Sequence, residues 1–265
     1  MDFRGGGAAL TEVIDRTYDI FSPYKLSGSL DVCTACCVTL EEAQALVNTP
    51  LKEVSGRLLG QFNDSAQSKT SPDFDQLNYF LPRYFELLAN RQAPSHSLPL
   101  ALHRLTPFSA ERWTKEERQC IDDFAMALFL AHLNAPTETL WMWNTTPILL
   151  MFWKANINIQ PLLRLWEDNP TPTAVLDFVH LAVSEIDWTC QPPRFIHSFA
   201  EAHMSEPIVA WIRSDAVRNK LGPALESCIL RDFTFEDYKN DVTFSYLAEA
   251  DLSGAYDLIH PARPA

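Results

Sequence analysis

The sequence predicts an all-α fold, either an irregular multi-helix bundle or an α-solenoid-like helical array. Three observations lead to this prediction. Apolar residues recur at helical spacing along most of the chain. Only eight of the 265 residues are glycine, so the turn residue that all-β folds need is scarce. The 18 prolines mostly lie between the apolar periodic segments, where a proline starts or ends a helix.

The composition is that of a folded chain with a sizeable core. Apolar residues make up 47% of the sequence and aromatic residues 11%, which is far too many for a disordered protein. The length fits one large domain or two small ones. We expect a single helical domain over 1–265, with a subdomain boundary near 92–100, where Pro94 to Pro99 form a polar, proline-containing connector.

The first predicted helices follow from apolar stripes and capping signals. Residues 8–21 carry one stripe, which Ser22-Pro23 closes. Thr39 and Glu42 have the capping-box spacing and open a helix that ends near Asn48. A helix over 50–62 follows, with Pro50 at its first position. Another begins at Ser71-Pro72 and runs to about 88, and its internal Pro82 should kink or divide it.

A second capping box, Thr114 with Glu117, opens the most regular predicted helix, over 115–134. The section 234–259 could hold two short helices, with a strand at Val242 to Phe244. The remaining predicted helices cover residues 138–155, 160–167, 173–187, 193–203, 207–218 and 223–231.

No segment has the pattern of a membrane anchor or an export signal. The most apolar stretch, Leu140 to Trp153, is interrupted by Asn144 to Pro147 and falls short of the roughly 20 residues that a membrane span needs. We interpret it as buried core. The first residues lack an apolar signal region, so we expect a cytoplasmic protein that does not bind membranes and whose six cysteines are reduced.

The acidic charge narrows the choice of partner. The formal net charge is −13, from 34 acidic and 21 basic side chains. A chain of this charge repels the phosphate backbone, so non-specific nucleic-acid binding is not expected. The same charge favours a basic partner protein through electrostatic steering. Solubility alone would also account for it.

The turn Cys33-x-x-Cys36-Cys37 is the strongest local signal. A Cys-x-x-Cys turn places two thiolates at the spacing that tetrahedral zinc requires, and Cys37 adds a third sulfur. A second ligand pair is missing, because Cys120, Cys190 and Cys228 stand alone. Small thiols packing a turn and a redox pair at the start of a helix are the alternatives. No other cofactor is expected.

Catalytic motifs are absent. The seven histidines show no ligand spacing along a helix, and neither a nucleophile elbow nor a glycine-rich phosphate loop occurs. His132 and His180 fall within apolar helical runs and are expected to be core histidines. We therefore predict no catalytic residue.

The C-terminal section combines acids with aromatics. Aromatic anchors surrounded by carboxylates suit the capture of a basic protein surface. A pair of amphipathic helices with core aromatics would produce the same pattern. The predicted partner-binding residues are Asp232, Phe235, Glu236, Asp237, Tyr238, Asp241, Glu249 and Asp251.

Residues 30–90 carry a resemblance. The Cys turn, the Thr49-Pro50-Leu51 step and the run Phe80-Leu-Pro-Arg83 leading into Glu86 resemble a group of bacterial helical proteins. In that group a Cys-rich turn precedes a helix, and a Phe-Leu-Pro-Arg helix follows. The resemblance implies a bacterial, cytosolic, helical protein and no particular activity.

These features favour a non-catalytic binding protein. The leading hypothesis is an immunity protein that neutralises a basic bacterial toxin by occluding its active site or substrate surface. One alternative is a zinc-dependent enzyme or zinc-stabilised regulator built on Cys33, Cys36 and Cys37. A second alternative is an α-solenoid scaffold protein.

Overall fold

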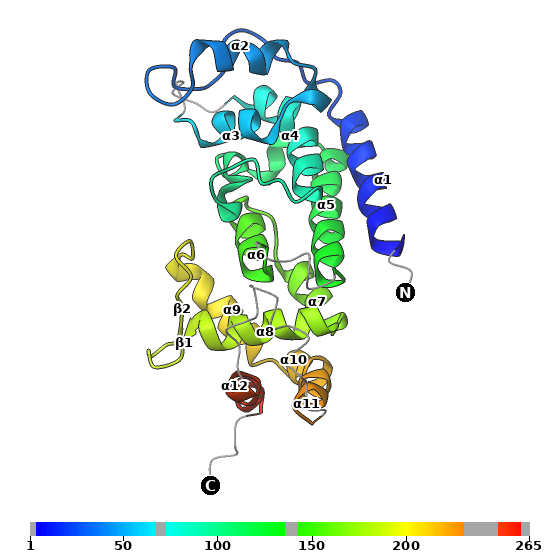
Figure 1. Cartoon of the computed structure of the whole chain (residues 1–265), viewed down its shortest axis with the longest axis vertical. Helices are drawn as coiled ribbons and strands as arrows, with labels where there is room; N and C mark the ends of the chain where they lie inside the picture. The colour runs from blue at the N-terminus through cyan, green and yellow to red at the C-terminus, as the bar shows by residue number, and fades with distance from the viewer. Residues whose placement is uncertain (1–3, 67–72, 136–142, 231–248, 261–265) are drawn as a thin grey trace. The chain divides into compact units, whose positions relative to one another are not determined.

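The computed structural model describes residues 4–66, 73–135, 143–230 and 249–260 (Figure 1). Within these residues the secondary structure consists of helices and one two-stranded antiparallel sheet. The predicted all-α, multi-helix fold is therefore confirmed. None of the described helices is long and apolar enough to cross a membrane.

The chain packs as two compact units. Unit 1 comprises 1–131 with 151–159, and unit 2 comprises 132–150 with 160–265. Residues 92–100, where the sequence suggested a subdomain boundary, lie inside unit 1.

Unit 1 is built from α-helices and short 3-10 helices, which are labelled η. Its core lies where α1, α4 and α5 meet. The rings of Phe85 and Phe124 stack with centroids 3.7 Å apart, and Phe152 meets Phe124 edge-on. The elements are α1 Arg4–Ile20, α2 Leu40–Asn48, η1 Leu51–Glu53, α3 Gly56–Asp64, α4 Phe74–Ala89, η2 Leu98–Leu100, η3 His103–Leu105, η4 Ala110–Arg112 and α5 Lys115–Leu133.

Both predicted capping boxes are present. At the start of α2, Thr39 Oγ1 accepts from the backbone N–H of Glu42, and the Glu42 carboxylate accepts from the N–H of Thr39. Thr114 and Glu117 make the same reciprocal pair at the start of α5. Each box satisfies two N–H groups that a helix start would otherwise leave without partners, which is why the two helices begin where the sequence predicted.

The prediction of one continuous helix over 50–62 is wrong, because this segment forms two separate helices. A 3-10 turn, η1, is followed by a break at Val54, and α3 starts only after Ser55, whose Oγ accepts from the N–H of Leu58. The carbonyl of Val54 instead accepts from Arg83 Nε at 2.8 Å. A tertiary contact and a new cap therefore interrupt the helical periodicity.

α4 was expected to be kinked or divided at Pro82, but it continues through this residue as one helix. Its N-cap is Asp73, two residues later than predicted. Pro82 is buried together with its neighbours Phe80 and Leu81. We attribute the continuity to this burial, since tertiary packing of an apolar face can outweigh the missing hydrogen bond of one proline.

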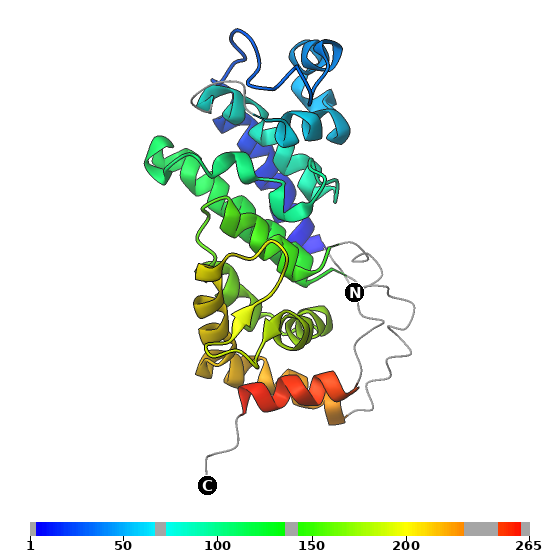
Figure 2. The ribbon, with the colours of Figure 1, turned by 90° about the vertical axis from the view of Figure 1, so that its left-hand side faces the viewer.

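Unit 2 is centred on α8, in which every residue from Thr173 to Ala182 is buried. α12 packs against α8 and α11, and Figure 2 shows α12, in red, beside the orange α11. The last two residues of α5, His132 and Leu133, belong to unit 2, and residues 151–154 at the end of α6 belong to unit 1. The other elements are α6 Thr145–Lys154, α7 Gln160–Asp168, α8 Pro172–Ser184, β1 Ile186–Asp187, β2 Arg194–Phe195, η6 Ala202–Met204, α9 Ser205–Ile212, α10 Asp215–Lys220, α11 Gly222–Leu230 and α12 Glu249–Ile259.

Two helix predictions fail in unit 2. Residues 193–203 do not form a helix, because Arg194 and Phe195 pair with Asp187 and Ile186 in the small sheet. The adjoining Pro192 and Pro193 cannot donate the backbone hydrogen bonds that a helix interior requires. The helix predicted over 207–218 is split into α9 and α10 by Ser214, which caps α10.

The apolar stretch that the sequence assigned to the core is mostly buried over its described residues 143–153. Ile148 to Phe152 have no exposed surface. Residues 138–142, the first part of the helix predicted over 138–155, lie outside the described residues, as does the strand considered at 242–244.

Candidate metal centre

Three cysteine thiols meet on one turn at the surface of unit 1. The Sγ atoms of Cys33 and Cys36 lie 3.4 Å apart, and those of Cys36 and Cys37 are also 3.4 Å apart. All three sulfurs lie within 4.8 Å of one another. Cys36 is exposed, and Cys33 and Cys37 are half-buried. The structure thus brings together the three residues that the sequence proposed as metal ligands.

The turn closes locally. The carbonyl of Cys33 accepts hydrogen bonds from the backbone N–H groups of Cys37 and Val38, at 3.2 and 3.1 Å. Val32 and Val38, on either side of the cysteines, are both buried. Two apolar anchors therefore hold the ends of a segment whose sulfurs remain accessible to solvent. The capping box of Thr39 starts α2 immediately afterwards.

Two neighbouring helices fix this segment from outside. The N–H of Cys33 donates to Ser65 Oγ at 2.9 Å, just beyond the end of α3. On α4, the buried Gln76 accepts from the N–H of Asp31 and donates to the carbonyl of Ser29. The backbone that leads into the turn is consequently held by side chains more than 30 residues away.

The buried Arg104 connects the end of α3 to the segment that leads into the Cys turn. Its Nε donates to the carbonyl of Asn63 at 3.1 Å, Nη2 to Ser65 at 3.0 Å and Nη1 to Asp31 at 3.3 Å. Its guanidinium also lies 4.2 Å from the ring centroid of Phe62. Because Asn63 and Ser65 are at the C-terminal end of α3, the cation faces the negative end of the helix dipole. Arg104 thereby ties the end of α3 to the chain entering the Cys turn.

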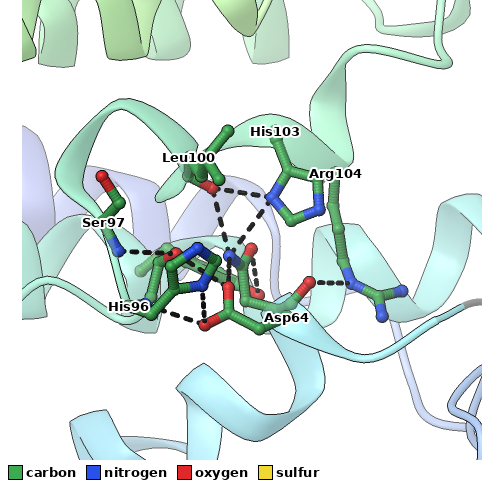
Figure 3. A network of polar contacts seen from close by, with 9 residues as sticks. Asp64, His96, Ser97, Leu100, His103 and Arg104 are labelled. Carbon is green, nitrogen blue, oxygen red and sulfur yellow. Dashed lines mark hydrogen bonds and ion pairs between the residues drawn. The ribbon is translucent and has the colours of Figure 1, made fainter. Parts of the chain in front are cut away.

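The other side of α3's end is held by a second polar network (Figure 3). Asp64 accepts from Ser95 Oγ at 2.7 Å and from the N–H and Nδ1 of His96 at 2.8 and 2.9 Å. Burial alone would raise the pKa of Asp64, but these hydrogen bonds outweigh it and hold the pKa below its ordinary value. His103 Nδ1 contacts the carbonyl of Leu100 at 2.7 Å, and burial lowers its pKa. These hydrogen bonds hold the 95–103 loop against the C-terminal end of α3.

The thiols of the turn differ in acidity. The hydrogen bond from Cys36, followed by those from the backbone N–H groups of Ala35 and Cys36, lowers the pKa of Cys33. Hydrogen bonds with Cys37 and Cys33 raise the pKa of Cys36 to about 11. The pKa of Cys33 therefore lies below that of Cys36. A cation that bound all three sulfurs would displace the remaining protons, because only thiolates ligate a metal.

The donor set fits a soft or borderline cation. Zinc binds thiolates at about 2.3 Å in tetrahedral geometry, which places neighbouring sulfurs slightly under 4 Å apart. The observed spacing is within a small side-chain adjustment of that arrangement. Among the described residues, this is the one group of three cysteine, histidine, aspartate or glutamate side chains with such proximity, and none of the described residues adds a fourth ligand to it. A bound zinc would thus keep one coordination position for water or another ligand.

The remaining cysteines make other contacts. All six cysteines lie in the described part of the chain, and none forms a disulfide. Cys120 is buried against Thr17 Oγ1 at 3.2 Å, and Cys190 donates to the carboxylate of Asp187 at 3.1 Å. Neither belongs to the Cys turn.

The predicted acidic partner surface is mostly beyond what the structure describes. Asp232, Phe235, Glu236, Asp237, Tyr238 and Asp241 lie outside the described residues. Glu249 is the first residue of α12, and Asp251 is half-buried on the same helix. The partner-binding role of this section stays a prediction.

A buried polar cluster in unit 2 was missed by the sequence analysis. His132 Nε2 lies 3.0 Å from Thr145 Oγ1 and 3.2 Å from Asp177 Oδ2, and Thr145 also donates to Asp177. Within the described residues, His132 Nδ1 and Asp177 Oδ1 have no hydrogen-bond partner. His132 and His180 are both buried, as predicted for core histidines. Thr145 and Asp177, each within an apolar run, were the signal that such a cluster exists.

Comparison with known proteins adds no assignment. No family model, curated protein or solved structure matches this chain.

Proposed function

We propose that the protein binds a zinc ion through Cys33, Cys36 and Cys37, and that this three-thiolate turn is its functional centre. The observation that carries the proposal is the convergence of three sulfurs within 4.8 Å on a single accessible turn. Among the sequence-based hypotheses, this one corresponds to the zinc-dependent enzyme or zinc-stabilised regulator.

The surroundings of the turn support this proposal. Exposed thiols packed together without a ligand contribute little apolar burial, yet Ser65, Gln76 and Arg104 all hold the chain that carries them. Such outer contacts orient ligands and are part of metal sites generally. An open fourth position is the layout of zinc sites that exchange ligands or polarise a bound water. We therefore propose an accessible zinc site with an open coordination position, and not a closed structural zinc site.

The first test is the metal content of the chain purified without a metal-binding tag. We expect about one zinc per chain, which is the stoichiometry of a single mononuclear site. Structural zinc sites yield about 10–16 kcal/mol from four ligands, so losing one thiolate should cost about 3 kcal/mol, or at least 100-fold in affinity. Cys33→Ser, Cys36→Ser and Cys37→Ser should each show this loss, measured by competition with a chromophoric chelator.

Cys190→Ser is the matched control, because Cys190 bonds to Asp187 and stands apart from the turn. It should retain zinc with the affinity of the unmodified chain. A chain that takes up no zinc, and whose three turn thiols all react freely with a thiol reagent, would contradict the proposal.

A second prediction concerns Ser65, which positions the turn without touching the ion. Ser65→Ala removes the acceptor for the N–H of Cys33. Outer contacts of this kind contribute about 10–100-fold to metal affinity, so we expect a drop of about 10-fold with the stoichiometry unchanged. Ser227→Ala, which removes only a contact to the carbonyl of Pro223 on α11, should leave the affinity unaltered. Equal affinities for both variants would show that Ser65 has no positioning role.

A further inference from the structure

We propose that the Cys turn is a redox-controlled metal site, in which hydrogen peroxide joins Cys33 to Cys36 as a disulfide and the bound ion is released. This inference rests on the proposed zinc binding and names how that same site is regulated. It is carried by the relative placement of the three sulfurs and by the exposure of Cys36, which exceeds that of Cys120, Cys190 and Cys228.

The sulfur of Cys36 is the central one of the three. It lies 3.4 Å from Cys33 Sγ and 3.4 Å from Cys37 Sγ. A disulfide bond measures about 2.05 Å, so either pair would have to close by about 1.4 Å. Cys36 is exposed, and the turn is anchored by the buried residues that flank it. Cys36 can therefore move toward a partner while the ends of the segment stay in place.

Backbone geometry selects Cys33 as that partner. The Cα atoms of adjacent residues such as Cys36 and Cys37 are about 3.8 Å apart across a trans peptide, which is shorter than the roughly 4.4–6.8 Å that disulfides span. Cys33 and Cys36 have the Cys-x-x-Cys spacing, which accommodates a disulfide readily. Their connecting chain is already curled by the hydrogen bond from the N–H of Cys37 to the carbonyl of Cys33.

The chemistry balances with peroxide as the oxidant. One thiolate attacks a peroxide oxygen, the O–O bond breaks, and hydroxide leaves, so that the sulfur becomes a sulfenic acid. The second thiolate attacks that sulfur, the S–S bond forms, and a second hydroxide departs. Two thiolates lose two electrons in total, and one hydrogen peroxide is reduced to two hydroxides. Cys37 is left as the single thiolate of the turn, which cannot hold the ion alone.

Oxidation elsewhere in the chain would not release the ion. Cys120 is buried, Cys190 is half-buried and donates to Asp187, and Cys228 is half-buried on α11, whereas Cys36 is exposed. Peroxide should therefore act first at the turn, since susceptibility follows accessibility and thiolate character.

The experiment adds hydrogen peroxide to the zinc-loaded full chain in the presence of a chromophoric chelator. We expect release of about one zinc per chain, together with loss of two hydrogens from the peptide that contains the turn. Dithiothreitol should restore the thiols and zinc binding. In the metal-free chain, Cys37→Ser should still form the disulfide, whereas Cys33→Ser and Cys36→Ser should not.

The outcomes separate this inference from the proposal beneath it. A chain that never takes up zinc overturns the proposed function. A chain that binds zinc but keeps it under peroxide overturns only the redox inference. Release accompanied by a Cys36–Cys37 bond, or by sulfinic acids without a disulfide, also overturns it.

Discussion

Replacing Arg104 with alanine is expected to lower the free energy of unfolding by about 3–5 kcal/mol. The side chain is 5% exposed, and its three donors serve the carbonyls of Asn63, Ser65 and Asp31. A buried carbonyl without a donor costs about 1–3 kcal/mol, and water can replace only some of these contacts. Denaturant unfolding followed by circular dichroism measures the change.

Two further arginine variants make the test specific. Arg57, whose side chain is 73% exposed and pairs with Glu42, is the matched control, and Arg57→Ala should cost less than about 1 kcal/mol. Arg104→Lys keeps the charge but lacks the planar fork that reaches three acceptors, so its cost should lie between the two. If Arg104→Ala were as mild as Arg57→Ala, the carbonyl contacts would contribute nothing net.

The same variant reports on the Cys turn. Because Arg104 holds the carbonyl of Asp31, two residues before Cys33, its loss should also weaken zinc binding in whatever fraction remains folded. Arg57→Ala should leave zinc affinity unchanged.

Replacing Asp177 with alanine should be comparably damaging, at about 3–5 kcal/mol, because it leaves other buried polar groups without their partner. Asp177, on α8, is 2% exposed and accepts from Thr145 at the start of α6, while His132 of α5 lies 3.2 Å away. Removing the carboxylate leaves the buried side chains of His132 on α5 and Thr145 on α6 without this hydrogen-bond partner. Thermal and denaturant unfolding of the full chain would measure the loss.

Asp177→Asn provides the near-isosteric comparison. It keeps the shape and one acceptor, so we expect a smaller loss than with alanine. Asp257, exposed on α12, is the surface control, and Asp257→Ala should change stability by no more than about 0.5 kcal/mol. A loss for Asp177→Ala no larger than that of the surface control would mean that the cluster is not needed for stability.

Local signals identified the elements best where the chain itself supplies the partners. The capping boxes at Thr39 and Thr114 lie within four residues of the groups they satisfy, so their helices start where predicted. The Cys turn is similar, because five consecutive residues contain all three sulfurs. The spacing of the cysteines was therefore enough to predict a candidate metal site.

Contacts with residues outside the predicted helix itself account for most of what was missed. The break before α3 depends on Arg83, which bonds Val54 from 29 residues away, and the failed helix over 193–203 depends on pairing between Ile186 and Phe195. The cluster of His132, Thr145 and Asp177 likewise unites three helices. Periodicity within a short window carries no information about such partners.

By itself, the sequence determined the all-α class, the helix starts with reciprocal caps and the presence of three clustered cysteines, because each depends on residues a few positions apart. Only the tertiary structure decided what supports the Cys turn and how its sulfurs lie. Ser65, Gln76 and Arg104 reach it from 32, 45 and 73 residues away along the chain. Those contacts form only when the helices pack, since a buried carbonyl or cation requires a partner that local sequence does not specify.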